Sequence, residues 1–355
     1  MNKEIKALYI HIPFCNKICD YCDFTKLQYF RNFALNYLEA LKDELVSYKI
    51  KDLKTIYVGG GTPTALEDDL FDQLLEIIKP YSKGVKEYTF EANPESVSLS
   101  KIKMLKEHGV NRISLGVQTT NDKILKMVNR EHSFAQVKEA IKNLKENGID
   151  NINVDLILGL PHTSEKILRE DLNNILSLDI KHISCYGLTV NPHTVLFNKG
   201  FKEPEGDILR KYYDIVEETL TKHGFIHYEV SNWAKPGYQS EHNLTYWRNE
   251  QYYGVGLGAS GYITETRYKN TINLAEYLKR AFVNEKEKVS TRDKRTYQIM
   301  LNLRTIEGLD IDFVKDKQEE INSLISGGLL KKENNHLIPT YAGMMVLDQI
   351  ILRLL

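Results

Sequence analysis

The sequence is poor in cysteine, nearly neutral in charge and free of long apolar runs. It has 355 residues, of which only four are cysteine, and its formal net charge is -1. So few cysteines in a chain of this size argue against a disulfide-stapled secreted fold, and near neutrality argues against a nucleic-acid surface built on bulk charge. No apolar run reaches the length of a membrane span, and the opening MNKEIKALYI does not have the form of a secretory signal. We therefore expect a globular, cytoplasmic protein with reduced cysteines, no membrane-spanning segment and no nucleic-acid partner.

Three of the four cysteines lie together in the run HIPFCNKICDYCDF. Cys15, Cys19 and Cys22 have the spacing C-x3-C-x2-C and follow an apolar, strand-like run at 7–12. Three thiolates on one loop can hold three irons of a [4Fe-4S] cluster and leave the fourth iron open to a small molecule. Electron-transfer clusters use four cysteines, so this triad indicates a cluster that takes part in chemistry. Cys185 lies in a distant apolar run and is typical of a buried core thiol.

Other uses of the triad have less support in the sequence. A structural zinc site usually has a second pair of ligands downstream. His11 could supply a fourth ligand, but it belongs to the strand-like run before the loop. Motif and context together favour the cluster.

Strand and helix signals alternate through the first two-thirds of the chain. Apolar, β-rich runs occur at 7–12, 54–58, 87–92, 112–117, 151–158 and 182–189. Helical patterns lie between them, as in the spacing of Leu38, Leu41 and Leu45, at 98–109, and twice between 120 and 148. This order predicts an α/β fold with a parallel sheet, an open partial (β/α)6 barrel whose chemistry gathers at the carboxyl ends of the strands.

Polar or glycine-rich residues end or follow several of these strands. Each has an ordinary interpretation as a turn, cap or surface group, but their common position at one rim indicates a binding site. Backbone N–H groups of a glycine run can bind a ligand closely, and an acid inside a buried strand needs a partner. The residues concerned are Gly59 to Thr62, Glu91, Asn93, Gln118, Arg130 and Asp155.

Together these motifs resemble the radical S-adenosylmethionine (SAM) enzymes, and among them the coproporphyrinogen III dehydrogenase-like family. The matching runs, in the family's order, are YIHIPFCNKICDYCDF, GGGTPT, EANPES, GVQTTNDKILKMVNREH and NVDLILGLP, followed by YEVSNWAKPG, HNLTYW and GVGLGASG. The resemblance implies that Cys15, Cys19 and Cys22 hold a [4Fe-4S] cluster whose open iron binds SAM. It implies SAM contacts for Tyr9, Gly60, Gly61, Thr62, Glu91, Gln118, Arg130 and Asp155. It further implies a flavodoxin- or ferredoxin-type electron donor, which reduces the cluster so that SAM releases a 5′-deoxyadenosyl radical.

Three features favour the heme-chaperone branch of that family. The oxidase branch resembles C-x3-C-x2-C-x-C, and Phe24 stands at the position of the last cysteine in that motif. Because of this position, we count Phe24 among the cofactor-binding residues. Only fourteen residues precede Cys15, whereas the oxidases carry a longer extension. The run His242 to Trp247 matches the H-N-x-x-Y-W signature of the chaperone branch. The resemblance thus implies heme binding and delivery to acceptors such as respiratory cytochromes; the alternative is an oxygen-independent coproporphyrinogen III oxidase.

His242 is the candidate heme contact, with Tyr246 and Trp247 available to cover a porphyrin face. In the other interpretation, His242 is a hydrogen-bonded histidine that packs with the two aromatic rings between the domains. The sequence favours neither interpretation over the other. The run Gly256 to Gly261 fits G-x-G-x-x-G, but it lies outside any strand–helix–strand unit, so close backbone packing is the better interpretation.

The chain is expected to divide into a core domain at 1–225 and a smaller α+β domain at 226–355. The tail GGLLKKENNHLIPTYAGMMVLDQIILRLL predicts a turn, a short strand pair and an apolar helix, which resembles a winged helix. Asn191 stands where relatives commonly carry glutamate. We therefore do not transfer the substrate or heme contacts of relatives to this region.

Overall fold

The computed structural model describes residues 4–355, and its centre is a sheet of nine strands in the order β11-β1-β4-β5-β6-β7-β8-β10-β9. Six of these are the predicted parallel strands: β1 (Ala7–Ile12), β4 (Thr55–Gly60), β5 (Glu87–Ala92), β6 (Arg112–Gln118), β7 (Asn151–Leu158) and β8 (His182–Gly187). The predicted parallel sheet is therefore confirmed, with strands in sequence order.

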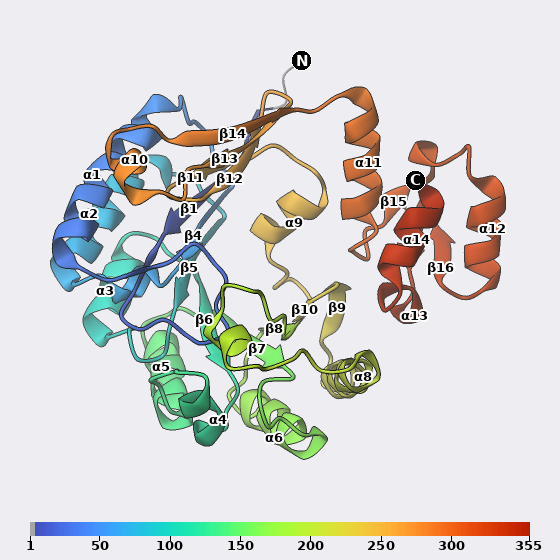
Figure 1. Ribbon diagram of the computed structural model, residues 1–355, viewed down its shortest axis with the longest axis horizontal. Coiled ribbons are helices and arrows are strands. Elements are labelled where there is room, and N and C mark those ends of the chain that lie inside the picture. Colours follow the sequence, from blue (N-terminus) through green and yellow to red (C-terminus); the bar gives the residue numbers. More distant parts are fainter. Residues whose placement is uncertain (1–3) are drawn as a thin grey trace.

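Helices cover the outer face of this sheet, as in an open barrel (Figure 1). They are α1 (Arg31–Ser47), α2 (Asp68–Ile78), α3 (Leu99–Glu107), α4 (Asp122–Met127), α5 (Phe134–Glu146), α6 (Glu165–Leu176) and α8 (Gly206–Lys222). Each presents an apolar stripe to the strands; in α1 the predicted Leu38, Leu41 and Leu45 are all buried. One continuous apolar core joins all of these helices except α4 to the sheet. The buried Ile124 of α4 belongs to a smaller cluster with Leu160, Leu188 and Leu196. Such burial supplies most of the stability of amphipathic helices.

Three further strands complete the sheet. β11 (Tyr253–Val255) runs parallel to β1, and β10 (Asn232–Ala234) and β9 (Ile226–Glu229) add antiparallel strands beyond β8. All three follow residue 225, so the predicted division of the chain there is not a division of this sheet. The division of the chain into two domains at residue 225 remains a prediction.

A three-stranded antiparallel sheet follows the barrel strands in the chain. Its strands are β12 (Ser260–Ile263), β13 (Thr266–Asn270) and β14 (Val283–Lys288), with α10 (Leu274–Leu278) inserted before β14. The short helix α9 (Glu241–Trp247) lies under the amino ends of the strands, where Glu87 accepts hydrogen bonds from the N–H groups of Glu241 at 2.8 Å and His242 at 3.1 Å.

The C-terminal region has a core of its own. It contains α11 (Thr291–Asn302), α12 (Gln318–Ser326), α13 (Tyr341–Met344) and α14 (Leu347–Leu354) around the small sheet β15-β17-β16, at Leu309–Asp310, His336–Pro339 and Leu330–Glu333. Buried leucines and isoleucines of these elements form a separate cluster. The predicted strand pair and final apolar helix are confirmed, and this small α+β domain lies to one side of the barrel (Figure 1). Within residues 4–355, none of the helices combines the length and hydropathy of a membrane span.

Candidate functional site

A cavity of about 400 Å³ lies at the carboxyl ends of the strands. It brings together the cysteine loop and most of the residues predicted from strand ends. The predicted residues that line it are Cys15, Cys19, Cys22, Phe24, Gly60, Gly61, Thr62, Glu91, Gln118, Arg130 and Asp155. Most of the predicted site residues thus meet in one place, because the carboxyl ends of parallel strands share one edge.

The cysteine loop is anchored on both sides. β2 (Phe14–Cys15) pairs with β3 (Leu27–Gln28), and the N–H of Asp20 donates to the carbonyl of Val128 at 3.1 Å. Two side chains approach the sulfurs: Thr62 Oγ1 lies 3.7 Å from Cys15 Sγ, and Arg130 Nη1 lies 3.6 Å from Cys19 Sγ. Burial raises the pKa of the Cys15 thiol to about 12. A thiolate there needs a cation, which the irons of a cluster supply.

The three thiols line one cavity, where each can bind a separate iron. Within residues 4–355, no three His, Cys, Asp or Glu side chains converge as ligands of one metal ion. Zinc requires its sulfur ligands at about 2.3 Å from one centre. Each cysteine of a four-iron cluster binds a separate iron, so three thiols around a cavity fit that group.

Glu91 lies near the carboxyl end of β5 and lines the cavity. Its carboxylate accepts hydrogen bonds from the Tyr57 phenol at 2.8 Å and from the Gly60 N–H at 2.9 Å. Burial raises the pKa of Glu91 to about 7, although these two donors pull it down. An ammonium group that enters the cavity would stabilise the ionised form of this partly buried carboxylate.

Asp155 lies on the neighbouring part of the same rim. Ser114 Oγ donates to Asp155 Oδ2 at 3.0 Å, and Asn153 Nδ2 donates to Asp155 Oδ1 at 2.8 Å. Burial raises the pKa of this carboxyl as well. These partners satisfy the acid that the sequence placed inside an apolar strand, and they fix its position for hydroxyl donors of a ligand.

Arg130 and Gln118 form the third side of the cavity. Arg130 Nη2 donates to the carbonyl of Gly116 and, at 2.9 Å, to Asn93 Oδ1, while its buried Nε has no protein partner. Gln118 sits at an irregularity of the β6–β7 register and has a φ of 68°. Strained backbone at a bulge often aims a side chain into a binding site.

The glycine run brings backbone close to the cysteine loop. Gly60 has a φ of 118°, and a Cβ there would lie 2.7 Å from the His11 ring. A Cβ at Gly61 would lie 2.8 Å from the carbonyl of Phe14. Only glycine fits these two positions, which is why the predicted turn is also a wall of the cavity.

Comparison with known proteins agrees with this geometry. The model of the radical SAM superfamily matches residues 9–175. A heme chaperone HemW of Lactococcus lactis is 38% identical over 97% of this chain and 95% of its own length, and that of Bacillus subtilis is 41% identical over 86% and 85%. The chain belongs to the HemW family of radical SAM proteins. The solved radical SAM enzyme coproporphyrinogen III oxidase (HemN) of Escherichia coli has the same fold, with a TM-score of 0.85 over 99% of this chain and 90% of that one at 21% identity.

The histidine of the HemW-type motif is buried outside this cavity. His242 Nδ1 lies 2.9 Å from Thr55 Oγ1, and Nε2 lies 2.7 Å from the Tyr246 hydroxyl. Burial lowers the pKa of His242 to about 3. Both ring nitrogens thus have partners, which is the geometry of the packed histidine. Iron could be bound only after one of these hydrogen bonds is released.

Tyr9 also lies behind the cavity. Its hydroxyl is 2.9 Å from His11 Nδ1, and its ring packs against Tyr57 at 6.1 Å between centroids. Tyr9 therefore packs behind the residues that line the cavity and is not itself one of the lining residues. Phe24 is different: it lines the mouth and is 67% exposed.

Sequence reasoning missed several lining residues, among them Tyr57, Ser114 and Tyr186. Tyr57 and Ser114 occupy inward positions of β4 and β6, and Ser114 is the register partner of Glu91. Side chains two residues apart in a strand lie on the same face of the sheet. This alternation could have predicted both residues, because Ser114 shares a face with Gly116 and Tyr57 shares a face with Gly59. Two other predictions are confirmed: Cys185 is a fully buried core thiol, and the late glycine run packs against His11 and Tyr37.

Proposed function

We propose that this protein is a heme chaperone that also binds a [4Fe-4S] cluster and SAM. The observation that carries the proposal is the meeting of three thiols, an arginine and two partly buried carboxylates in one cavity, in a chain of the HemW family. Relatives over nearly the full length are named heme chaperones.

The residues divide the binding of the cofactors between them. Cys15, Cys19 and Cys22 hold the cluster; Glu91 takes the amino group of SAM and Arg130 its carboxylate. Asp155 accepts hydrogen bonds from the ribose, and the backbone at Gly60 and Gly61 completes the wall. When bound and reduced, the cluster supplies one electron to SAM. The surrounding side chains position both groups and limit access of water.

Further parts of the proposal concern partners. Lys17 and Lys26 at the mouth of the cavity suit an acidic flavodoxin- or ferredoxin-type donor. Heme-binding respiratory proteins are the proposed acceptors, and the cytoplasm, where thiols stay reduced, is the proposed compartment. The heme contact at His242 stays a prediction.

The alternative is a coproporphyrinogen III oxidase, whose fold this chain shares. Phe24, which replaces a cysteine of that branch, favours the chaperone. The experiment gives anaerobically reconstituted protein coproporphyrinogen III, SAM and a reductant, and separately mixes heme-loaded protein with a heme-free cytochrome. We expect transfer of heme and no protoporphyrinogen. Formation of protoporphyrinogen without heme transfer would establish the oxidase instead.

A further inference from the structure

A path of hydrogen bonds crosses the inside of the barrel from Asp155 to the start of α9. Asp155 Oδ1 accepts from Asn153 Nδ2 at 2.8 Å. Asn153 Oδ1 lies 2.6 Å from His182 Nδ1, and His182 Nε2 lies 2.8 Å from the Tyr228 hydroxyl. The Tyr228 oxygen accepts from the backbone N–H of Ser240, the N-cap of α9, at 3.2 Å. The path thus joins the cavity at the cysteine loop to the helix that carries the HemW-type motif.

The backbone N–H at the end of this path fixes the direction of every bond in it. Because an N–H can only donate, the Tyr228 oxygen accepts from Ser240 and its own hydrogen is left to donate to His182 Nε2. With Nε2 accepting, the hydrogen of a neutral imidazole is on Nδ1, which donates to Asn153 Oδ1. The Asn153 amide is then turned so that Nδ2 donates to Asp155. Every donor points toward one carboxylate, and hydrogen bonds aligned in this way strengthen one another.

The middle of the path is closed to water. His182, Asn153 and Tyr228 are each 2% exposed or less. Burial lowers the pKa of His182 well below its usual value, so the imidazole is neutral and has one donor and one acceptor, as the path requires. Because water cannot replace a lost partner here, a change at one group alters the orientation of the next.

Ser114 holds the other oxygen of Asp155. Its Oγ accepts from Asn153 Nδ2 at 2.7 Å and donates to Asp155 Oδ2 at 3.0 Å. The Asn153 amide therefore controls both oxygens, one directly and one through the serine. An ionised carboxylate can accept more than one hydrogen bond at each oxygen, and Asp155 lines the cavity. Its remaining lone pairs are available to hydroxyl groups of a ligand.

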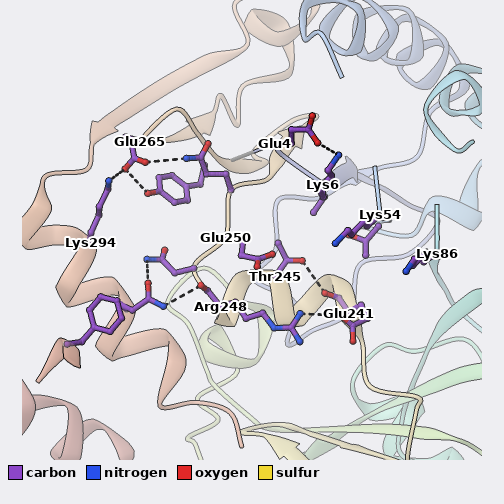
Figure 2. Close-up of a pocket in the computed structure, with 17 residues that line it drawn as sticks. Glu4, Lys6, Lys54, Lys86, Glu241, Thr245, Arg248, Glu250, Glu265 and Lys294 are labelled. Atoms are coloured by element: carbon purple, nitrogen blue, oxygen red, sulfur yellow. Dashed lines mark hydrogen bonds and ion pairs between the residues drawn. The ribbon is translucent and has the colours of Figure 1, made fainter. Parts of the chain in front are cut away.

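The far end of the path is held by Glu87. Its carboxylate accepts from Ser240 Oγ at 3.2 Å and from the N–H groups of Glu241 at 2.8 Å and His242 at 3.1 Å. Figure 2 shows the helix that begins here, with Glu241 and Thr245 in the lining of a second cavity at the amino ends of the strands. The start of α9 thus presents the N–H of Ser240 at a fixed place.

We propose that His182 is a positioning residue for SAM, which holds the Asn153 amide in the orientation that aims Asp155 at the ribose hydroxyls. The inference rests on the proposed function, in which Asp155 binds the ribose. Because Ser240 fixes the direction of the path, α9 sets how firmly this carboxylate is held. The helix of the HemW-type motif thereby supports SAM binding from the opposite end of the barrel.

The test compares SAM with its 2′,3′-dideoxy analogue, which lacks the hydroxyls that Asp155 would bind. Both are titrated calorimetrically into anaerobically reconstituted wild type and variants, and wild type should bind the analogue about tenfold more weakly than SAM. We expect His182→Leu to weaken SAM binding about tenfold and to leave affinity for the analogue within about twofold of wild type. In His182→Asn, the amide Nδ2–H replaces the imidazole Nδ1–H, so this variant should recover most of the affinity for SAM.

Two further variants complete the series. Tyr228→Phe removes only the hydroxyl that fixes the imidazole tautomer, and it should weaken SAM binding about threefold without effect on the analogue. It tests the same path if His182→Leu does not fold. His227→Leu is the matched control, because His227 is a buried histidine of β9 outside the path and the cavity lining. The control should match wild type with both ligands.

Each result has a separate meaning. Equal losses for SAM and the analogue, or unchanged SAM binding in the folded His182→Leu and Tyr228→Phe variants, overturn the positioning role while the proposed function stands. A wild type that binds SAM and the analogue equally overturns this inference together with the ribose contact of Asp155, and leaves cluster and heme binding in place. A wild type that binds no SAM overturns both the inference and the SAM site of the proposed function.

Discussion

Tyr57 and Glu91 are joined by a hydrogen bond of 2.8 Å inside the barrel, the phenol donating to carboxylate Oε1. Glu91 belongs to the motifs that identify the family, whereas Tyr57 precedes the glycine run without belonging to it. The bond orients the carboxylate toward the cavity and favours its ionised form. Tyr57 is thus a positioning residue for the group that we propose to bind the SAM ammonium.

Substitution Tyr57→Phe should weaken SAM binding by about three- to tenfold, because one hydrogen bond to a charged group is lost. Calorimetric titration of SAM into the reconstituted protein measures the effect. Tyr88→Phe is the matched control, since the Tyr88 hydroxyl is buried in the adjacent strand without a hydrogen-bond partner. Equal losses in the two variants would argue against the positioning role.

SAM affinity should rise with pH through about 7. Burial raises the pKa of Glu91 to about 7, so the carboxylate that pairs with the ammonium becomes available only as the pH passes that value. The sign is opposite for folding: Glu91 holds its proton to a higher pH when folded, so its contribution to stability falls as pH rises from about 4.5 to about 7. Glu91→Gln should bind SAM weakly with little dependence on pH. A wild-type affinity that stays constant across this range would contradict the assignment.

Substitution Cys19→Ala should abolish the visible absorption of the cluster and the reductive cleavage of SAM. Cys185→Ala provides the control, because Cys185 is a buried thiol of β8 outside the cavity lining. That variant should keep the cluster and lose only the packing of one sulfur atom, about 1 kcal/mol in the free energy of unfolding. Unchanged iron content in Cys19→Ala would contradict the assignment of Cys19 as a ligand of the cluster.

The neutral His242 should make folding sensitive to acid. Its pKa is lowered to about 3 by burial, while the unfolded value is near 6.5. The stability it contributes is therefore complete above about pH 6.5 and is lost as pH falls toward 3, by about 1.4 kcal/mol per pH unit. Urea unfolding of wild type and His242→Gln checks this. The stability difference between them should shrink as pH falls from about 6.5 to about 5. A difference that stays constant would mean that the fold does not lower the pKa of His242.

The sequence predicted the parts of the fold that depend on local pattern. The six apolar runs became the six parallel strands because each was bounded by turn residues and separated by a helix-forming stretch. The cysteine loop followed from spacing alone. Position in the barrel then brought Glu91, Gln118, Arg130 and Asp155 to one edge, as the common direction of the strands requires.

Packing between residues far apart in the chain could not be predicted from such local patterns. β11 joins the sheet beside β1, although more than two hundred residues separate them, and no local pattern records that pairing. For His242 the motif indicated a heme contact, but only the structure showed that Thr55 and Tyr246 occupy both nitrogens.

Equilibrium titration of the anaerobically reconstituted protein with heme, followed at the Soret band, tests the central claim most directly. The account predicts saturable, stoichiometric heme binding by protein that also carries the cluster and SAM. No saturable Soret change would contradict it.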